Sequence, residues 1–292
     1  MSSTLSHIAR TTACTFLAIS VVFPFQKTHR EISKSKEKEL TVIVDVSFGS
    51  LYVQKVERNQ KDKIAVIDYE QREEDSDRLQ ISYDVSGERG KLKIKQKKVS
   101  HWSSDDDDGE NKHKNRRLTL SLSSDLPISF ELELGAGKGD IDLTSLQVQD
   151  LKISTGASSV DLRCDDPNSI SADYVEIESG VSKFTAYNLG NMNFRKMKFD
   201  GGLGSYKLDF GGKLQQDASV DIEVGLGSIS VVVPKETKAK VVYDDGWFSS
   251  FDVDRRFTKE RSGVYVSDAG ENGRLLTMKI ESGLGSVKVT TK

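Results

Sequence analysis

The chain has 292 residues, enough for one or two domains with a sizeable core, but only 36% of them are hydrophobic and 30% are charged. These proportions favour a thin core with a large solvated surface. The formal net charge of -3 comes from 42 basic and 45 acidic residues spread along most of the chain, so no basic field exists to hold a phosphate backbone, and we expect no nucleic-acid partner.

The N-terminus has the pattern of a secretory signal peptide. Residues 13–25 are almost wholly apolar, and a highly polar stretch follows them. About thirteen apolar residues are too few to cross a hydrocarbon core, which needs roughly 20. We therefore predict a signal peptide over residues 1–26 and a charged spacer over 27–39. The alternative is a short uncleaved anchor, which would be the protein's only membrane contact. The expected location is extracytoplasmic: periplasmic, secreted or at the cell surface.

The chain has two cysteines, Cys14 in the predicted signal peptide and Cys164. If the signal peptide is removed, Cys164 stands alone and no intramolecular disulfide can form. No cysteine pair has metal-ligand spacing, and the four histidines lie outside the predicted strands. We expect no metal site and no cofactor.

Residues 40–125 form the next predicted region. Stretches that alternate apolar and polar residues, as a half-buried strand does, occupy residues 40–46, 64–69, 79–85, 91–97 and 117–122. Whether they pair as part of a solenoid or as a separate antiparallel sheet stays open. A polar excursion over 101–116 separates two of them, and its aspartate run lacks the ligand spacing of a calcium loop.

One short phrase recurs between residues 132 and 233, in forms such as LELGAGKGDIDL and VDIEVGLGSISV, and closes the chain at 276–289. The first glycines of its five central copies are 21, 24, 22 and 23 residues apart: Gly135, Gly156, Gly180, Gly202 and Gly225. A period of about 22 is typical of a solenoid in which each repeat is one turn. Each copy predicts two short strands joined at a corner, where glycine supplies a positive φ.

Stacked turns of this kind pair equivalent strands in parallel, about 4.8 Å apart, and line one continuous core. The predicted fold is all-β: a right-handed parallel β-helix, or a closely related single-sheet solenoid, with rungs of about 22 residues. It covers residues 126–233, with antiparallel strands flanking its N-terminal side. Residues 234–292 supply a capping insertion and the closing strand. An antiparallel sandwich or barrel is the alternative, which the near-constant period disfavours.

The Gly-x-Gly-Ser corners, the phrase DLPISFELELGAG at residues 125–137 and the closing phrase IESGLGSVKV at 280–289 carry a family resemblance. They resemble the bacterial toast-rack and putative-adhesin β-strand repeat families, and the C-terminal domain of LiaF-like envelope-stress proteins. The resemblance covers residues 40–292 loosely and 125–292 better. It implies a non-catalytic extracytoplasmic β-solenoid with a role in adhesion or envelope sensing, and it supplies no ligand residues.

Two patterns could be mistaken for catalytic or nucleotide-binding motifs. The phrase at residues 135–140 lacks the Lys-Ser or Lys-Thr pair and the following helix of a phosphate loop, so we expect no nucleotide. Four aspartates occupy repeat-strand positions: Asp140, Asp142, Asp161 and Asp221. A hydrolase needs two carboxylates at a fixed separation in a cleft, whereas outward aspartates occur on any solvated strand. We predict no catalytic residue.

The best interaction candidates are the aromatic residues Trp247, Phe248 and Phe251, which would either contact a partner or cap the end of the coil. The sequence thus favours a non-catalytic, adhesin-like binding or structural module at the bacterial cell envelope, with an envelope protein or polysaccharide as partner. The alternatives are a carbohydrate-active β-helix enzyme and a self-assembling envelope filament or stress-sensing module.

Overall fold

A computed structural model describes residues 25–72, 79–96, 116–244, 248–269 and 273–292. The protein is all-β within these ranges, apart from two short 3-10 helices, η1 (Arg58–Gln60) and η2 (Leu189–Met192). No helix in the described ranges is long and apolar enough to span a membrane. The predicted signal peptide lies almost wholly outside the described residues, as does the polar excursion except for Arg116.

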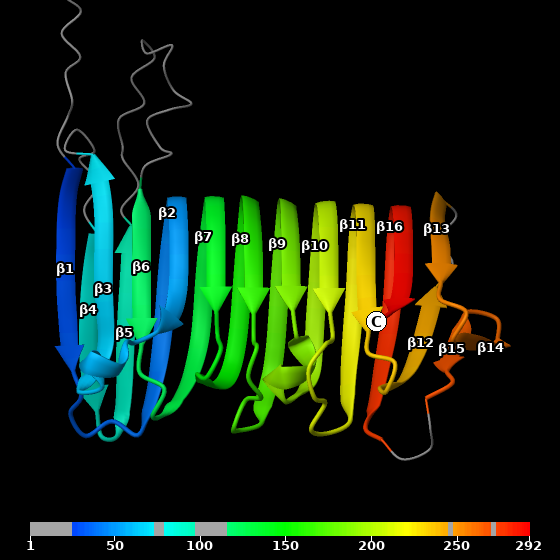
Figure 1. Cartoon of the computed structure of the whole chain (residues 1–292). Coiled ribbons are helices and arrows are strands. Elements are labelled where there is room, and N and C mark those ends of the chain that lie inside the picture. Colours follow the sequence, from blue (N-terminus) through cyan, green and yellow to red (C-terminus); the bar gives the residue numbers. More distant parts are fainter. Residues whose placement is uncertain (1–24, 73–78, 97–115, 245–247, 270–272) are drawn as a thin grey trace, which may run out of the picture.

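Seven bent strands of 16 or 17 residues lie side by side and form the centre of one open sheet (Figure 1). In spatial order they are β2 (Glu39–Lys55), β7 (Pro127–Asp142), β8 (Gln147–Arg163), β9 (Ala172–Tyr187), β10 (Phe194–Asp209), β11 (Ala218–Val233) and β16 (Leu275–Thr291). Each pairs with the next in parallel, with equivalent residues opposite each other. The antiparallel sandwich or barrel is therefore wrong for residues 126–233.

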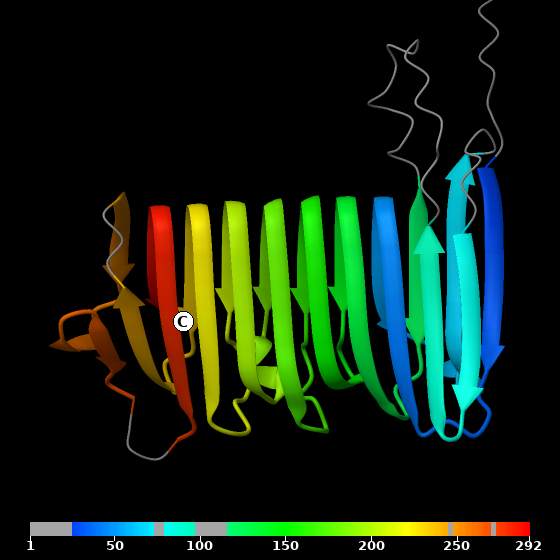
Figure 2. The same cartoon turned by 180° about the vertical axis from the view of Figure 1, so that it is seen from behind.

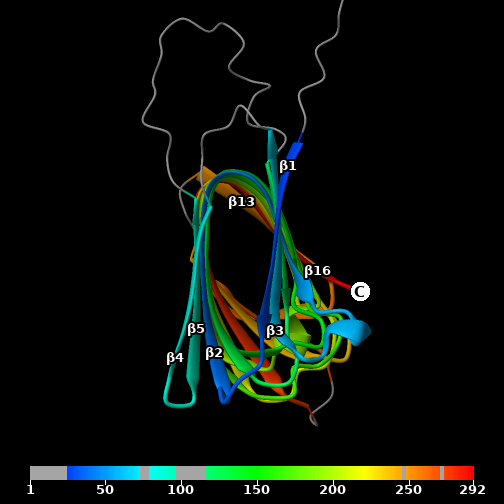
Figure 3. The ribbon, with the colours of Figure 1, turned by 90° about the vertical axis from the view of Figure 1, so that its left-hand side faces the viewer.

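Each repeat is one continuous strand, whereas the sequence predicted two short strands meeting at a corner. The strand bends through an irregular step at its glycines: Gly201 pairs with Val224, and the next paired residue is Leu203, opposite Leu226. The unpaired residue on each strand, Gly202 on β10 and Gly225 on β11, shifts the phase of burial while the register is kept. Because pairing resumes at once, the ladder is not broken. Figure 3 shows the bent strands superposed along the stack and curving over its interior.

Each end of the stack carries a rung divided between two strands. At one end β5 (Arg89–Gln96) pairs with the first half of β2, and β6 (Arg117–Leu122) pairs with its second half. At the other end β12 (Lys238–Asp244) and β13 (Phe248–Val253) cover the two halves of β16 in the same way. All four pairings are parallel. The predicted polar excursion thus connects the two halves of one rung.

Antiparallel strands lie outside both divided rungs. On one side are β1 (Phe25–Ser33), β3 (Lys63–Arg72) and β4 (Leu79–Ser86), the last of which is seen with β5 in Figure 2. On the other are β14 (Phe257–Arg261) and β15 (Val264–Ser267). The region 40–125 therefore joins the same sheet, with both kinds of pairing.

One sequence-based boundary, that of the charged spacer, differs from this arrangement. Strand β1 occupies most of the predicted spacer 27–39, and it was missed because most of its described side chains are exposed, so the segment lacks the apolar alternation of a half-buried strand. The chain's final strand, β16, lies between β11 and β12. The insertion that precedes it in sequence therefore lies beyond it in the stack.

The core is one continuous cluster that runs through every rung of the stack. Aromatic side chains fill its middle: Phe199 lies edge-on to Phe184 at 5.8 Å between ring centroids and to Tyr206 at 5.2 Å. The Tyr206 hydroxyl donates to the carbonyl oxygen of Gly180 at 3.2 Å. This packing makes the rungs one unit that positions the outer surface.

Cys164 is a free, buried cysteine. Burial, assisted by Asp165, Asp142 and Asp166, raises the pKa of its thiol to about 12. Because the thiolate is the nucleophile, we expect Cys164 in a Cys14→Ser protein to resist an aromatic disulfide reagent at about pH 8 and to react fully in denaturant. Absorbance of the released thiol measures both reactions, and rapid labelling of the native protein would contradict the burial described here.

Candidate functional site

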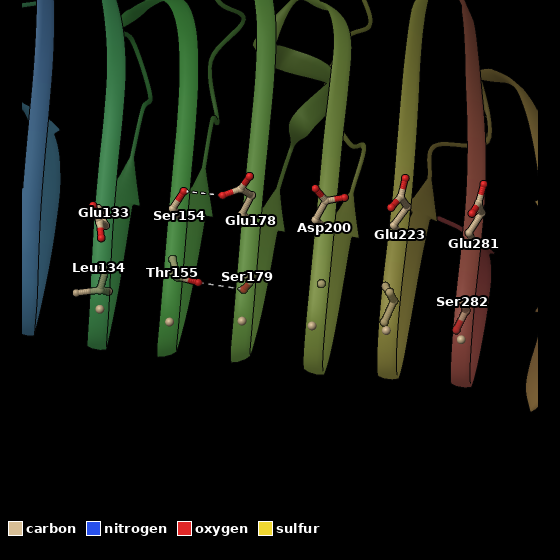
Figure 4. A pocket seen from close by; sticks show the side chains of 18 of the residues that line it. Glu133, Leu134, Ser154, Thr155, Glu178, Ser179, Asp200, Glu223, Glu281 and Ser282 are labelled. Carbon is tan, nitrogen blue, oxygen red and sulfur yellow. Dashed lines mark hydrogen bonds between the residues drawn. The ribbon is translucent and has the colours of Figure 1, made fainter.

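Carboxylates lie side by side across the strands, just before the bend (Figure 4). Pairing register aligns eight positions from β2 to β12, which we call the acidic row: Asp45, Glu133, Ser154, Glu178, Asp200, Glu223, Glu281 and Asp244. The one hydroxyl, that of Ser154, donates to Glu178 at 3.0 Å. Because neighbouring strands are about 4.8 Å apart, the row concentrates negative charge along a line.

Lysines offset only part of this charge. Lys198 bonds Asp200 at 2.8 Å, Lys279 pairs with Glu281, and Lys95 lies 3.1 Å from Asp45. The hydrogen bond to Asp200 raises the pKa of Lys198, and the one to Glu281 does the same for Lys279. Glu133, Glu178, Glu223 and Asp244 have no ion-pair partner within the described ranges. The row therefore keeps a net negative charge.

A groove of about 990 Å³ runs along the acidic row from β7 to β12. Its floor consists of one glycine from each of six strands: Gly135, Gly156, Gly180, Gly202, Gly225 and Gly283. A Cβ at Gly156 would lie 2.3 Å from the carbonyl oxygen of Gly135, and one at Gly283 would lie 2.6 Å from that of Gly225. Close strand packing thus favours glycine at these positions, while the buried side chains of Thr155, Ser179 and Ser282 also line the groove.

A second row, which we call the apolar ridge, begins one residue after the floor. Register aligns its members in the order Phe48, Ala136, Ala157, Val181, Leu203, Leu226, Leu284 and Phe248. Five of them are 45–61% exposed: Phe48, Val181, Leu203, Leu226 and Leu284. Within the described ranges, Tyr174 is the one other exposed large hydrophobic residue. Exposed apolar side chains are therefore gathered on a single line.

Of the three aromatic residues in the predicted interaction site, only Phe251 has a described side chain. Trp247 lies outside the described residues, and only the backbone of Phe248 is described. Phe251 is half-buried, stacks on Tyr243 at 4.2 Å between ring centroids, and lies 5.1 Å from Tyr265. Sequence reasoning did not single out these two tyrosines. A partner or capping contact by Trp247, Phe248 and Phe251 stays a prediction.

Three of the four aspartates considered for hydrolysis, Asp140, Asp142 and Asp161, lie around Arg163, and Asp221 lies apart from them. Asp140 and Asp161 are opposite each other on β7 and β8, and Asp140 is held in an ion pair by Arg163. Asp221 lies on β11, before the bend and two residues from Glu223 in the acidic row. In the part of the chain that the structure describes, no group of three or more acidic, histidine or cysteine side chains could hold a metal ion.

Sequence reasoning missed both rows, although part of the signal was present. An apolar residue separates two glycines at Leu203, Leu226 and Leu284, but the phrase indicated only a corner. The acidic row carries no motif, because Glu178, Asp200 and Glu223 come from different strands. Only the register brings them together.

These features define an all-β repeat protein built on one open sheet. The sequence matches the N-terminal domain of toast_rack, DUF2154, over residues 23–187, more than half of its length. The chain therefore belongs to the toast-rack family.

Several solved structures are similar. A putative cell adhesion protein from Clostridium sporogenes is 17% identical, with 92% of this chain and 100% of that chain covered and a TM-score of 0.48. A putative adhesin from Bacteroides fragilis is 14% identical, with 91% and 97% covered and a TM-score of 0.39. A search of curated proteins found no match.

Proposed function

We propose that this protein is a non-catalytic, adhesin-like binding module at the bacterial cell envelope, and that the acidic row and the apolar ridge are its binding surface. The observation that carries the proposal is the alignment of five exposed large apolar side chains in one row. A single exposed leucine needs no explanation, but a contiguous apolar patch beside a charged row is typical of an interaction site.

In this proposal the scaffold is a right-handed β-solenoid with about 22 residues in each turn. The parallel register supports it, since Leu203 pairs with Val181, 22 residues earlier, and with Leu226, 23 residues later. Repetition at this interval gives the surface its length, because every rung adds one ridge residue and one residue of the acidic row.

A binding role has more support than catalysis. A glycoside hydrolase uses two carboxylates in different environments, one of them protonated. The acidic row instead repeats equivalent carboxylates along an open groove, and Asp140 is held in an ion pair by Arg163. Repeated charges of one sign suit the recognition of an oppositely charged partner.

End-to-end assembly into a filament has less support. A parallel stack could grow by adding strands to its free edges, but antiparallel strands lie beyond the divided rungs at both ends. They interrupt the parallel pairing that a continuous filament would use. We propose an extracytoplasmic location from the apolar pattern of residues 13–25, with an envelope protein or polysaccharide as partner.

The test is cosedimentation of the purified full chain with isolated bacterial cell envelopes. We expect a Leu203→Ser, Leu226→Ser, Leu284→Ser protein to bind at least about tenfold more weakly, equivalent to about 1.4 kcal/mol or more. The control variant replaces Ser205, Ser228 and Ser286 by alanine. These serines lie two residues after the three leucines on the same strands. Equal binding by both variants would overturn the assignment of the ridge, and their thermal unfolding checks that both are folded.

A further inference from the structure

We infer that the ligand of this surface is a basic amphipathic α-helix, which lies along the groove and across the strands. The inference rests on the proposed function and names the class of partner. Apolar side chains of the helix would contact the apolar ridge, and lysine or arginine side chains on its flank would face the acidic row.

The spacing of the ridge favours a helix over an extended peptide. Neighbouring ridge positions are about 4.8 Å apart, because they belong to hydrogen-bonded strands. A helix presents a new apolar residue with each turn of about 5.4 Å, whereas an extended chain presents one on the same face about every 6.7 Å. Over the three intervals from Val181 to Leu284 the mismatch is about 2 Å for a helix and about 6 Å for an extended chain.

An extended peptide would also lack backbone partners in this orientation. The central strands already pair on both sides, so their backbone groups are used within the sheet. A helix satisfies its own backbone hydrogen bonds and needs only side-chain contacts.

The width of the surface also matches a helix. The acidic row and the ridge are three residues apart on each strand, as Asp200 and Leu203 are, which corresponds to at most about 10 Å. A helix with its side chains is about 10–12 Å across. Each of these strands has a glycine between the two rows, so the helix can approach closely while its two flanks contact different rows.

The charge of the groove selects a basic ligand. Seven of the eight positions in the acidic row are carboxylates, and Glu133, Glu178, Glu223 and Asp244 have no ion-pair partner in the described ranges. Two oxygens among the groove-lining residues, Asp200 Oδ1 and Ser282 Oγ, are buried without a hydrogen-bond partner there. The row would repel an anionic membrane. On the far side of the ridge, the row aligned with Ser205 holds serines together with the exposed Lys138 and Lys183, so a second copy is the competing occupant that sedimentation velocity tests.

The probe is a fluorescent helical peptide of about 18 leucines and lysines, about 27 Å long, with leucines on one face. Fluorescence anisotropy with the full chain measures its binding. We expect the acidic-row variant, which combines Glu178→Gln, Glu223→Gln and Glu281→Gln, to bind the peptide at least about tenfold more weakly than the wild type. The variant that replaces the three ridge leucines by serine should lose at least as much affinity. The control Asp161→Asn, Asp173→Asn, Asp252→Asn removes the same charge elsewhere and should leave affinity within about twofold. Added salt should weaken binding to the wild type.

Two further peptides separate shape from composition. A peptide in which leucine and lysine strictly alternate should bind more weakly than the leucine–lysine helix. A helix in which glutamate replaces lysine should also bind more weakly. Failure of the leucine–lysine helix to bind, or equal binding by the alternating peptide or by the acidic-row variant, would overturn the inference. The inference would also be overturned if the protein did not bind the helix but floated with phosphatidylcholine vesicles, or formed dimers in sedimentation velocity, and lost that behaviour when the ridge leucines were replaced by serine. Ridge-dependent envelope binding that excess helix fails to displace would reject the helix as ligand and leave the binding function standing.

Discussion

Replacing Gly227 by alanine should lower the free energy of unfolding by about 4 kcal/mol, because two costs combine at this position. Its φ is +134°, a conformation that residues with a Cβ rarely adopt. The added Cβ would also lie 2.0 Å from the carbonyl oxygen of Gly204 on the neighbouring strand. Neither strand can move away without disturbing the ladder that both form with the rest of the stack.

Two other glycines separate these costs. Gly87 has a φ of +62°, but a Cβ added there would meet no atom within 4 Å, so alanine should cost only about 1–2 kcal/mol from backbone strain. Gly273 has neither a positive φ nor a close neighbour, and alanine there should change stability by no more than about 0.5 kcal/mol. Urea unfolding followed by circular dichroism measures all three variants. A Gly227→Ala protein as stable as Gly273→Ala would show that the bend does not depend on glycine.

Replacing Phe199 by alanine should lower the free energy of unfolding by about 3–5 kcal/mol. The side chain is fully buried in the middle of the stack, edge-on to Phe184 and Tyr206. Its loss leaves a cavity, and the aromatic rings on either side are held by strands that are paired on both edges. The same urea titration provides the measurement.

Phe48→Ala is the matched control, since it removes the same side chain from the apolar ridge. Phe48 is 45% exposed, so its removal should cost about 1 kcal/mol. Equal losses for the two variants would mean that the ridge is part of the packed core and would remove the basis for treating it as a binding surface.

The strands of the repeats were predictable because their core is formed by local alternation. Val220, Ile222 and Val224 are separated by polar residues, and all three are buried. The repeat period correctly predicted that equivalent residues lie opposite each other in parallel. The continuity of each strand through the bend was not predictable, because it depends on hydrogen bonds that resume with the neighbouring strand after one unpaired residue.

The candidate site was less accessible to sequence reasoning than the fold. The sequence pattern identified Asp140 and Asp161 as repeated carboxylates, but the groove is lined by Glu178, Asp200 and Glu223. Each of these three looks like an ordinary solvated position on its own strand. Their importance arises from the charge of neighbouring rungs about 4.8 Å away, which no single repeat contains.

By itself the sequence determined the all-β class and the repeat of about 22 residues, since these follow from the side-chain period within one rung and from its repetition. Only the tertiary structure decided the order of the strands, with β16 between β11 and β12, and the alignment of the acidic row beside the apolar ridge. The physical reason is that order and alignment depend on hydrogen bonds between strands, and the partner strand can be distant in sequence.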